Sequence, residues 1–154
     1  MTESNRGPHL ETFAATANGT GWPTSVKLTG TDWAIQVDES VEDGGSNSGP
    51  NPMHHLVASL AGCQNEQAQV VAEEMGVTAD RIDFTVEVEL NLDGFMGVAD
   101  HSEGCFQAVR LEAKIAGLNT DQVAQLGERV DARCPILSLL RSGGANIQTS
   151  WTAG

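Results

Sequence analysis

The sequence of 154 residues predicts an α+β sandwich with the element order β-β-β-α-β-β-α-α-β. Two observations predict this class. Some segments alternate apolar and polar residues with the period of a half-buried strand, and others carry the start signals and apolar spacing of helices. A second core would need roughly 100 more residues, so we expect one domain that spans residues 1–154.

The N-terminal part is expected to form short strands. Residues 11–17 are one candidate, and residues 24–28 and 33–37 flank the turn formers at 29–32, which is typical of a hairpin. Residues 42–50 are all loop formers. A loop of this length can close over a site, or it can be an ordinary surface loop.

A long helix is predicted to begin directly after this loop. Asn51 is a good N-cap and Pro52 suits the first helical position, and the helix would run to residue 75, a length of about 35 Å. Residues 53–63 are apolar almost all round, whereas the half that opens with Gln64 is more polar. A helix end that is apolar all round must be covered, which indicates a partner subunit.

The C-terminal half is expected to supply the main sheet and two further helices. Its strands alternate between apolar residues on one face and charged residues on the other, as half-buried strands do. The expected elements are strands at 83–92, 109–115 and 145–151, a loop at 93–104, a helix that Thr120 caps, and a short helix that follows Pro135 and stops at Gly143.

The charge of the chain excludes some partners. It has 21 acidic and 8 basic residues, a formal net charge of -13, which repels nucleic acid and anionic membrane surfaces. No apolar run approaches the roughly 18 residues that span a bilayer, and the polar N-terminus has no apolar segment of a signal peptide. We therefore expect a cytoplasmic protein with no nucleic-acid or membrane partner.

The cysteines are Cys63, Cys105 and Cys134. An odd number without a signal peptide argues against a structural disulfide framework. Cys105 has acidic neighbours and is interpreted as an incidental thiol. His54 and His55 begin the long helix, about 12 Å along its axis from Cys63, so one helix cannot supply both ligand types, and no metal site is predicted.

Two of the cysteines have notable contexts. Cys63 lies in mid-helix, where it is either a core cysteine or, because Gly62 leaves room beside it, a thiol that another group can approach closely. Cys134 precedes Pro135 and therefore occupies a helix cap. The helix dipole and free N–H groups there favour a thiolate, and Arg133 adds positive charge; the alternative is an ordinary small cap residue.

The segment at residues 49–63, Gly-Pro-Asn-Pro-Met-His-His-Leu-Val-Ala-Ser-Leu-Ala-Gly-Cys, resembles the central-helix motif of the OsmC/Ohr superfamily, the osmotically inducible and organic hydroperoxide resistance proteins. Cys134-Pro135 followed by an apolar helix resembles the second signature of the family. The separation of the two cysteines and the expected element order are also similar. The resemblance therefore covers nearly the whole chain.

The resemblance implies an intertwined homodimer, with two long helices at its centre between sheets that take strands from both chains. It also implies a bacterial thiol peroxidase for oxidative stress defence, which has no cofactor. Cys63 would attack an organic hydroperoxide and become a sulfenic acid, and Cys134 would close a disulfide that an external dithiol of lipoyl or thioredoxin type reduces. Leu56 and Leu60, near Cys63, would favour alkyl or lipid hydroperoxides.

The sequence departs from this pattern at the groups that activate the attacking cysteine. The family's hydroperoxide reductases use an arginine from the N-terminal strands, held by a glutamate at the position of Met53. The predicted N-terminal strands offer only Lys27, so Cys63 would need Lys27, His54, His55 or an arginine of a partner chain. The chain thus resembles the broader OsmC-like branch. The alternative function is binding of a small apolar ligand with little or no peroxidase activity.

Overall fold

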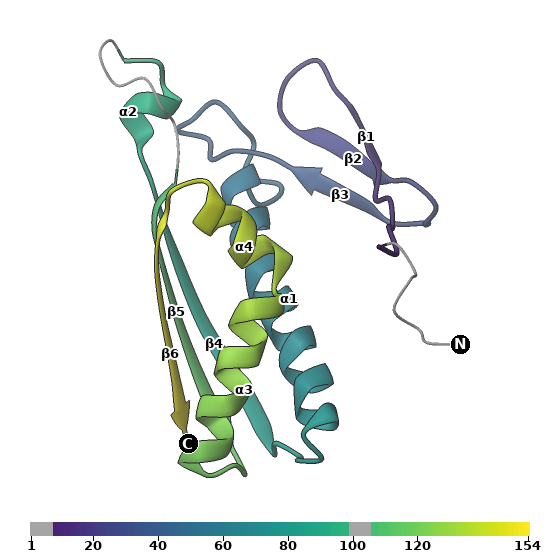
Figure 1. Cartoon of the computed structure of the whole chain (residues 1–154). Coiled ribbons are helices and arrows are strands. Elements are labelled where there is room, and N and C mark those ends of the chain that lie inside the picture. The colour runs from purple at the N-terminus through teal and green to yellow at the C-terminus, as the bar shows by residue number, and fades with distance from the viewer. Residues whose placement is uncertain (1–7, 99–105) are drawn as a thin grey trace. The chain divides into compact units, whose positions relative to one another are not determined.

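The computed structural model describes residues 8–98 and 106–154, and its elements follow one another as shown in Figure 1. The chain divides into two compact units, Met1–His55 and Leu56–Gly154. The predicted order of strands and long helices is confirmed, with one short helix, α2, added to it. Among the described residues, none of the helices combines the length and the apolar character that crossing a membrane requires.

The first unit contains a three-stranded antiparallel sheet in the order β1-β2-β3. The predicted hairpin is confirmed, because Leu28 N–H donates to the Trp33 carbonyl over 3.1 Å at its turn. The first strand begins later than residue 11, since the exposed residues before it have no partner strand in the register. The strands are β1 (Ala15–Asn18), β2 (Thr24–Leu28) and β3 (Ala34–Val37).

A buried carboxylate fastens the loop that follows β3. Asp38 is 0% exposed and accepts hydrogen bonds from the hydroxyls of Ser46 (2.6 Å) and Ser48 (2.7 Å) and from the N–H of Ser48 (2.9 Å). The Ser46 hydroxyl is the largest cause that holds the pKa of Asp38 well below its usual range. The N–H of Asp38 donates to the Pro50 carbonyl over 3.3 Å, so the predicted loop is closed at its base.

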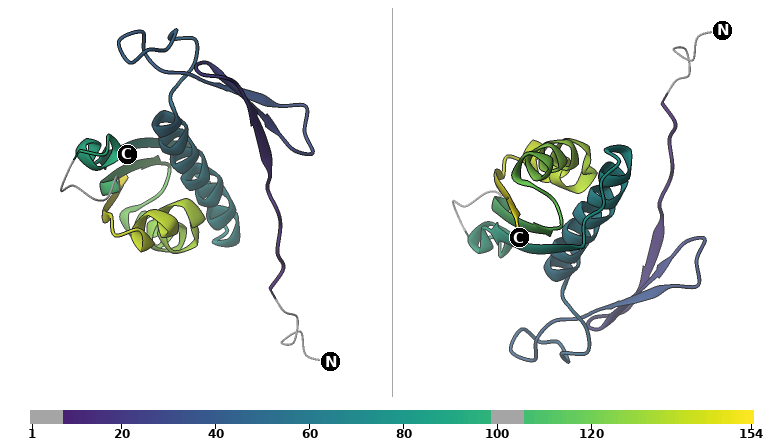
Figure 2. Two further views of the ribbon diagram at one scale, coloured as in Figure 1. Left: turned by 90° about the horizontal axis from the view of Figure 1, so that it is seen from above. Right: turned by 90° about the horizontal axis from the view of Figure 1, so that it is seen from below.

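The second unit is a sheet covered on one face by helices, as Figures 1 and 2 show. The sheet order is β4-β5-β6, with β4 and β5 antiparallel and β5 and β6 parallel. Helix α1 begins in the first unit and continues into this one. The elements are α1 (Pro52–Glu74), β4 (Arg81–Leu90), β5 (Phe106–Ala116), α3 (Thr120–Arg133), α4 (Pro135–Ser142) and β6 (Asn146–Ala153).

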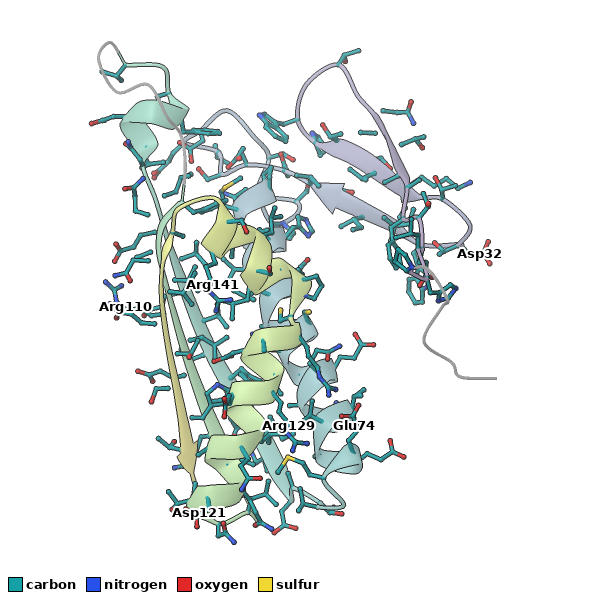
Figure 3. All side chains as sticks on the ribbon, viewed as in Figure 1. Asp32, Glu74, Arg110, Asp121, Arg129 and Arg141 are labelled. Atoms are coloured by element: carbon teal, nitrogen blue, oxygen red, sulfur yellow. The ribbon has the colours of Figure 1, made fainter. Side chains whose placement is uncertain are left out.

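The two faces of this sheet differ as the alternating sequence predicts. The inner face packs against α1 and α3, where Leu111 and Ile115 are almost fully buried, and against α4 through Val109. The outer face is charged: Arg110 points away from the helices (Figure 3) and pairs with Glu89 over 2.6 Å and Glu87 over 3.7 Å. One polar face remains open to solvent, as is common in antiparallel sheets.

Two local predictions are wrong. The loop expected at 93–104 begins with a one-turn helix, α2 (Leu92–Phe95), because the Asn91 side chain caps it by accepting from Gly94 N–H over 3.2 Å. Helix α3 is capped by Asn119 and not by Thr120. The Asn119 side chain accepts from Gln122 N–H over 2.9 Å, and the Gln122 side chain accepts from Asn119 N–H over 3.0 Å. The two bonds form a capping box.

Candidate active site

Two thiols from distant parts of the sequence meet inside the second unit. Cys63 comes from the middle of α1, and Cys134 joins α3 to α4. Both are free thiols, and their Sγ atoms lie 3.1 Å apart. Because a disulfide bond is about 2.05 Å long, a movement of about 1 Å would bring the two sulfur atoms to bonding distance.

The cap position predicted for Cys134 is confirmed. Cys134 ends α3, where its N–H donates to the Val130 carbonyl over 3.0 Å, and it also begins α4. Pro135 occupies the first turn of α4, and Leu137 N–H donates to the Cys134 Sγ over 3.4 Å. The sulfur therefore lies at the positive end of the α4 dipole.

The surroundings of the thiols are apolar, and the two cysteines differ in exposure. Cys134 is 0% exposed, whereas Cys63 is partly exposed. Leu60 is fully buried in the same cluster as Cys134, and Leu56 and Cys63 pack against that cluster. The other buried members of the cluster are Val109, Leu137, Leu140 and Ala145.

Burial is the main influence on the ionisation of Cys63. Loss of water raises the pKa of Cys63 to about 11, and the side chain and charge of Cys134 and the charge of Glu66 act in the same direction. The N–H of Ile136, at the start of α4, partly opposes this shift. None of these groups is a cation, so Cys63 is held as a thiol at neutral pH.

Arg133 was predicted to add positive charge beside Cys134, but in the structure its side chain pairs with Glu74. Its guanidinium forms two contacts of 2.8 Å with the Glu74 carboxylate, which Figure 3 shows at the end of α1. This fork-shaped pairing raises the pKa of Arg133 and lowers that of Glu74. The side chain thus joins the ends of α1 and α3.

The other candidate activating residues lie in the first unit. Lys27 is on β2 and lines a cleft of about 400 Å³ at the following turn. Met53, His54 and His55 lie in the first turn of α1, where His54 N–H donates to the Asn51 side chain over 2.9 Å. Cys105 lies outside the described residues. Within the described residues, no group of three or more His, Cys, Asp or Glu side chains is arranged to hold a metal ion.

Gln64 is a feature that the sequence interpretation missed. It was expected to open the polar half of α1, but it is 0% exposed. Neither its Nε2 nor its Oε1 has a hydrogen-bond partner among the described residues. The signal was in the spacing, since Leu60, Gln64 and Ala68 follow one another at four-residue intervals on the buried face of α1.

Solved structures of known proteins share this fold. An organic hydroperoxide resistance protein OsmC from Legionella pneumophila has 25% identity and a TM-score of 0.73, over 93% of this chain and 98% of that one. An organic hydroperoxide resistance protein from Elizabethkingia anophelis has 22% identity and a TM-score of 0.75, over 95% and 99%. OhrB of Bacillus subtilis has 21% identity and a TM-score of 0.67, over 95% and 100%. Among curated proteins, none is similar enough in sequence to count as a relative. The family described as OsmC-like protein matches residues 45–150, and the chain therefore belongs to the OsmC-like protein family.

Proposed function

We propose that this protein is a two-cysteine thiol peroxidase that reduces alkyl or lipid hydroperoxides. The observation that carries the proposal is the distance of 3.1 Å between the sulfur atoms of Cys63 and Cys134 in an apolar setting. A thiol pair at this distance can pass from sulfenic acid to disulfide with little movement. The names of the solved relatives, which are organic hydroperoxide resistance proteins, support the same class of substrate.

In the proposed cycle the Cys63 thiolate attacks the outer oxygen of the hydroperoxide. The O–O bond breaks, the alkoxide leaves and takes a proton to become the alcohol, and Cys63 carries a sulfenic acid. The Cys134 sulfur then attacks the Cys63 sulfur, and hydroxide leaves as water while the disulfide forms. An external dithiol of lipoyl or thioredoxin type returns the two electrons, and the cycle uses no cofactor.

Cys63 is chosen as the attacking thiol because it is the partly exposed member of the pair, whereas Cys134 is 0% exposed. Its thiolate is the scarce species, since burial raises its pKa to about 11. Fast reaction at neutral pH would need a cation near Cys63, supplied by Lys27, His54, His55 or an arginine of a partner chain; without one, the proposal places fast reaction at alkaline pH. Arg133 is engaged by Glu74 and is not assigned this role.

The proposal includes a homodimer in which residues 1–154 act as one OsmC-like domain. The first unit has large apolar side chains in solvent: Leu10 is 81%, Phe13 86% and Trp33 73% exposed. An apolar surface of this kind is typical of a face that a partner covers. The exposed face of α1 includes Ala58, whose side chain is a single methyl group, and Gly62, which has no side chain, and both let a second helix approach closely.

A second candidate function is binding of a small apolar ligand without turnover. The observation that favours it is the raised pKa of Cys63, because a protonated thiol reacts slowly with peroxides. The apolar cluster around Cys63 and Cys134 would then serve as the contact surface for the ligand.

The test is steady-state reduction of cumene hydroperoxide with dithiothreitol or dihydrolipoamide as electron donor. We expect C63S to lose activity and the control C105S to keep the activity of the parent protein. Without added reductant, C134S should consume one equivalent of hydroperoxide per chain and then stop. Full activity in both C63S and C134S would contradict the proposal. Saturable binding of fatty acids without consumption of hydroperoxide would favour the second function.

A further inference from the structure

The difference in exposure between the two sulfur atoms bears on the step that reopens the disulfide. Thiol–disulfide exchange begins when a thiolate attacks one of the two sulfur atoms, and access decides which one. Cys134 is 0% exposed and is enclosed by Leu60, Val109 and other members of its cluster. Cys63 is partly exposed. An incoming thiol therefore reaches the sulfur of Cys63 and not that of Cys134.

The position of Cys134 also suits it to be the departing sulfur. It begins α4, and Leu137 N–H donates to its Sγ over 3.4 Å. The amide groups and dipole at the start of a helix stabilise negative charge. A thiolate released at Cys134 thus forms where backbone donors already point at it.

Resting on the proposed peroxidase cycle, in which the reductant is a dithiol, we propose that it attacks the Cys63 Sγ of the Cys63–Cys134 disulfide, that Cys134 leaves, and that the favoured reductant has no negative charge beside its attacking sulfur. The first sulfur of the reductant bonds to Cys63 as the protein disulfide breaks. The electron pair of the broken S–S bond goes to Cys134, which takes a proton. The second sulfur of the reductant then attacks the first, Cys63 leaves and takes a proton, and the reductant departs as a cyclic disulfide.

The short distance between the protein sulfurs explains why a dithiol is needed. In the reduced protein the two sulfur atoms lie 3.1 Å apart, so a Cys134 thiolate that a monothiol releases stays close to Cys63 and can expel the monothiol again. A dithiol carries its second thiol with it, so that its own ring closure competes with this return reaction.

The charge preference follows from Glu66 and the whole chain. Glu66 is exposed, lies three residues after Cys63 on the same helix, and its charge acts on the Cys63 sulfur. The formal net charge of -13 has the same sign. Both disfavour the approach of an attacker that carries a carboxylate.

The site of attack can be mapped on wild-type protein that diamide has oxidised, so that hydroperoxide reactivity is not needed. A brief reaction with 2-mercaptoethanol is stopped with acid, free thiols are alkylated, and peptides are mapped by mass spectrometry at several early times. We expect the mercaptoethanol adduct on Cys63 to exceed that on Cys134 by about tenfold or more when extrapolated to zero time. A majority of adduct on Cys134 would overturn the proposal.

The same experiment separates this inference from the peroxidase activity. If diamide produces no Cys63–Cys134 disulfide, the sulfurs are not within reach and the inference falls. If the disulfide forms and opens at Cys63 although cumene hydroperoxide never oxidises the protein, the inference stands and the peroxidase function fails.

The charge preference has its own test on the diamide-oxidised protein. Cysteamine, 2-mercaptoethanol and 3-mercaptopropionate are compared by their rates per thiolate. We expect the cationic thiol to be about threefold to tenfold faster than the anionic one, with a smaller ratio in 1 M salt and in E66Q, and an unchanged ratio in the control E73Q. Equal rates for the three thiols would overturn the charge preference.

Discussion

The ionisation of Cys63 leads to the sharpest prediction, which concerns its alkylation as pH changes. Burial raises the pKa of Cys63 to about 11, above the ordinary value of 9.0. At pH 7 the thiolate then accounts for about one Cys63 in ten thousand, against about one in a hundred at the ordinary value. Since the thiolate is the reactive species, we expect alkylation about a hundredfold slower at pH 7 than for an unperturbed cysteine.

The assay is a timed exposure of the reduced protein to iodoacetamide between pH 6 and pH 10, followed by mass spectrometry of the Cys63 peptide. The same peptide in urea-unfolded protein supplies the reference rate. We expect the rate to rise about tenfold per pH unit without a plateau below pH 10. In C134S the curve moves to lower pH, because the Cys134 thiol raises the Cys63 pKa both through its hydrogen bond and through its charge.

In wild-type protein, an alkylation rate of Cys63 that rises with a midpoint at pH 6 to 7 and then levels off would refute this reasoning. It would mean that a cation such as Lys27, His54 or a partner arginine acts on Cys63 and outweighs burial. Repeating the series over a range of protein concentrations identifies the source, because a cation supplied by a partner chain is lost on dilution.

Three further predictions concern other residues. C134S treated with one equivalent of cumene hydroperoxide should hold a sulfenic acid on Cys63 that dimedone labels; a lack of labelling would contradict the order of attack. Q64L should raise the free energy of unfolding in urea by about 1–3 kcal/mol, because Gln64 is buried with an unbonded amide, whereas Q69L on the exposed face should change it by less than about 0.5 kcal/mol; marked destabilisation by Q64L would show that the amide has a partner. D38N should speed amide hydrogen exchange at Ser46 and Ser48, whose groups bond to that carboxylate, and D43N should not; equal protection in D38N would contradict the role of Asp38. Because the folded pKa of Asp38 is lowered, its contribution is complete above its unfolded pKa of about 3.9 and is lost only as pH falls below it, so loop protection corrected for intrinsic exchange should not change between pH 5 and pH 8.

The elements with a strong hydrophobic period were predictable from the sequence. The alternating pattern placed β4 and β5, and Asn51 with Pro52 placed the start of α1. The elements that were misplaced lack such a period. Strand β1 is exposed along its whole length, and α2 is a single turn that depends on one side-chain bond from Asn91.

The candidate site was predictable in its residues but not in its contacts. The contexts of Cys63 and Cys134 marked both as candidates. Their spacing in the sequence alone, however, does not predict that their sulfur atoms lie 3.1 Å apart. The pairing of Arg133 with Glu74, which are 59 positions apart, is a tertiary contact that no local pattern carries. Glutamine is usually exposed, but Gln64 is buried because it lies on the face of α1 that packs against the core.

The central claim is that Cys63 and Cys134 form a redox pair that responds to organic hydroperoxide. The most direct measurement is non-reducing peptide mapping after cumene hydroperoxide is added to the fully reduced protein at pH 9, where the Cys63 thiolate is about one in a hundred. The account predicts a Cys63–Cys134 crosslink and the loss of both thiols, with Cys105 unmodified. Two intact thiols after an hour, in protein that diamide still crosslinks, would contradict it.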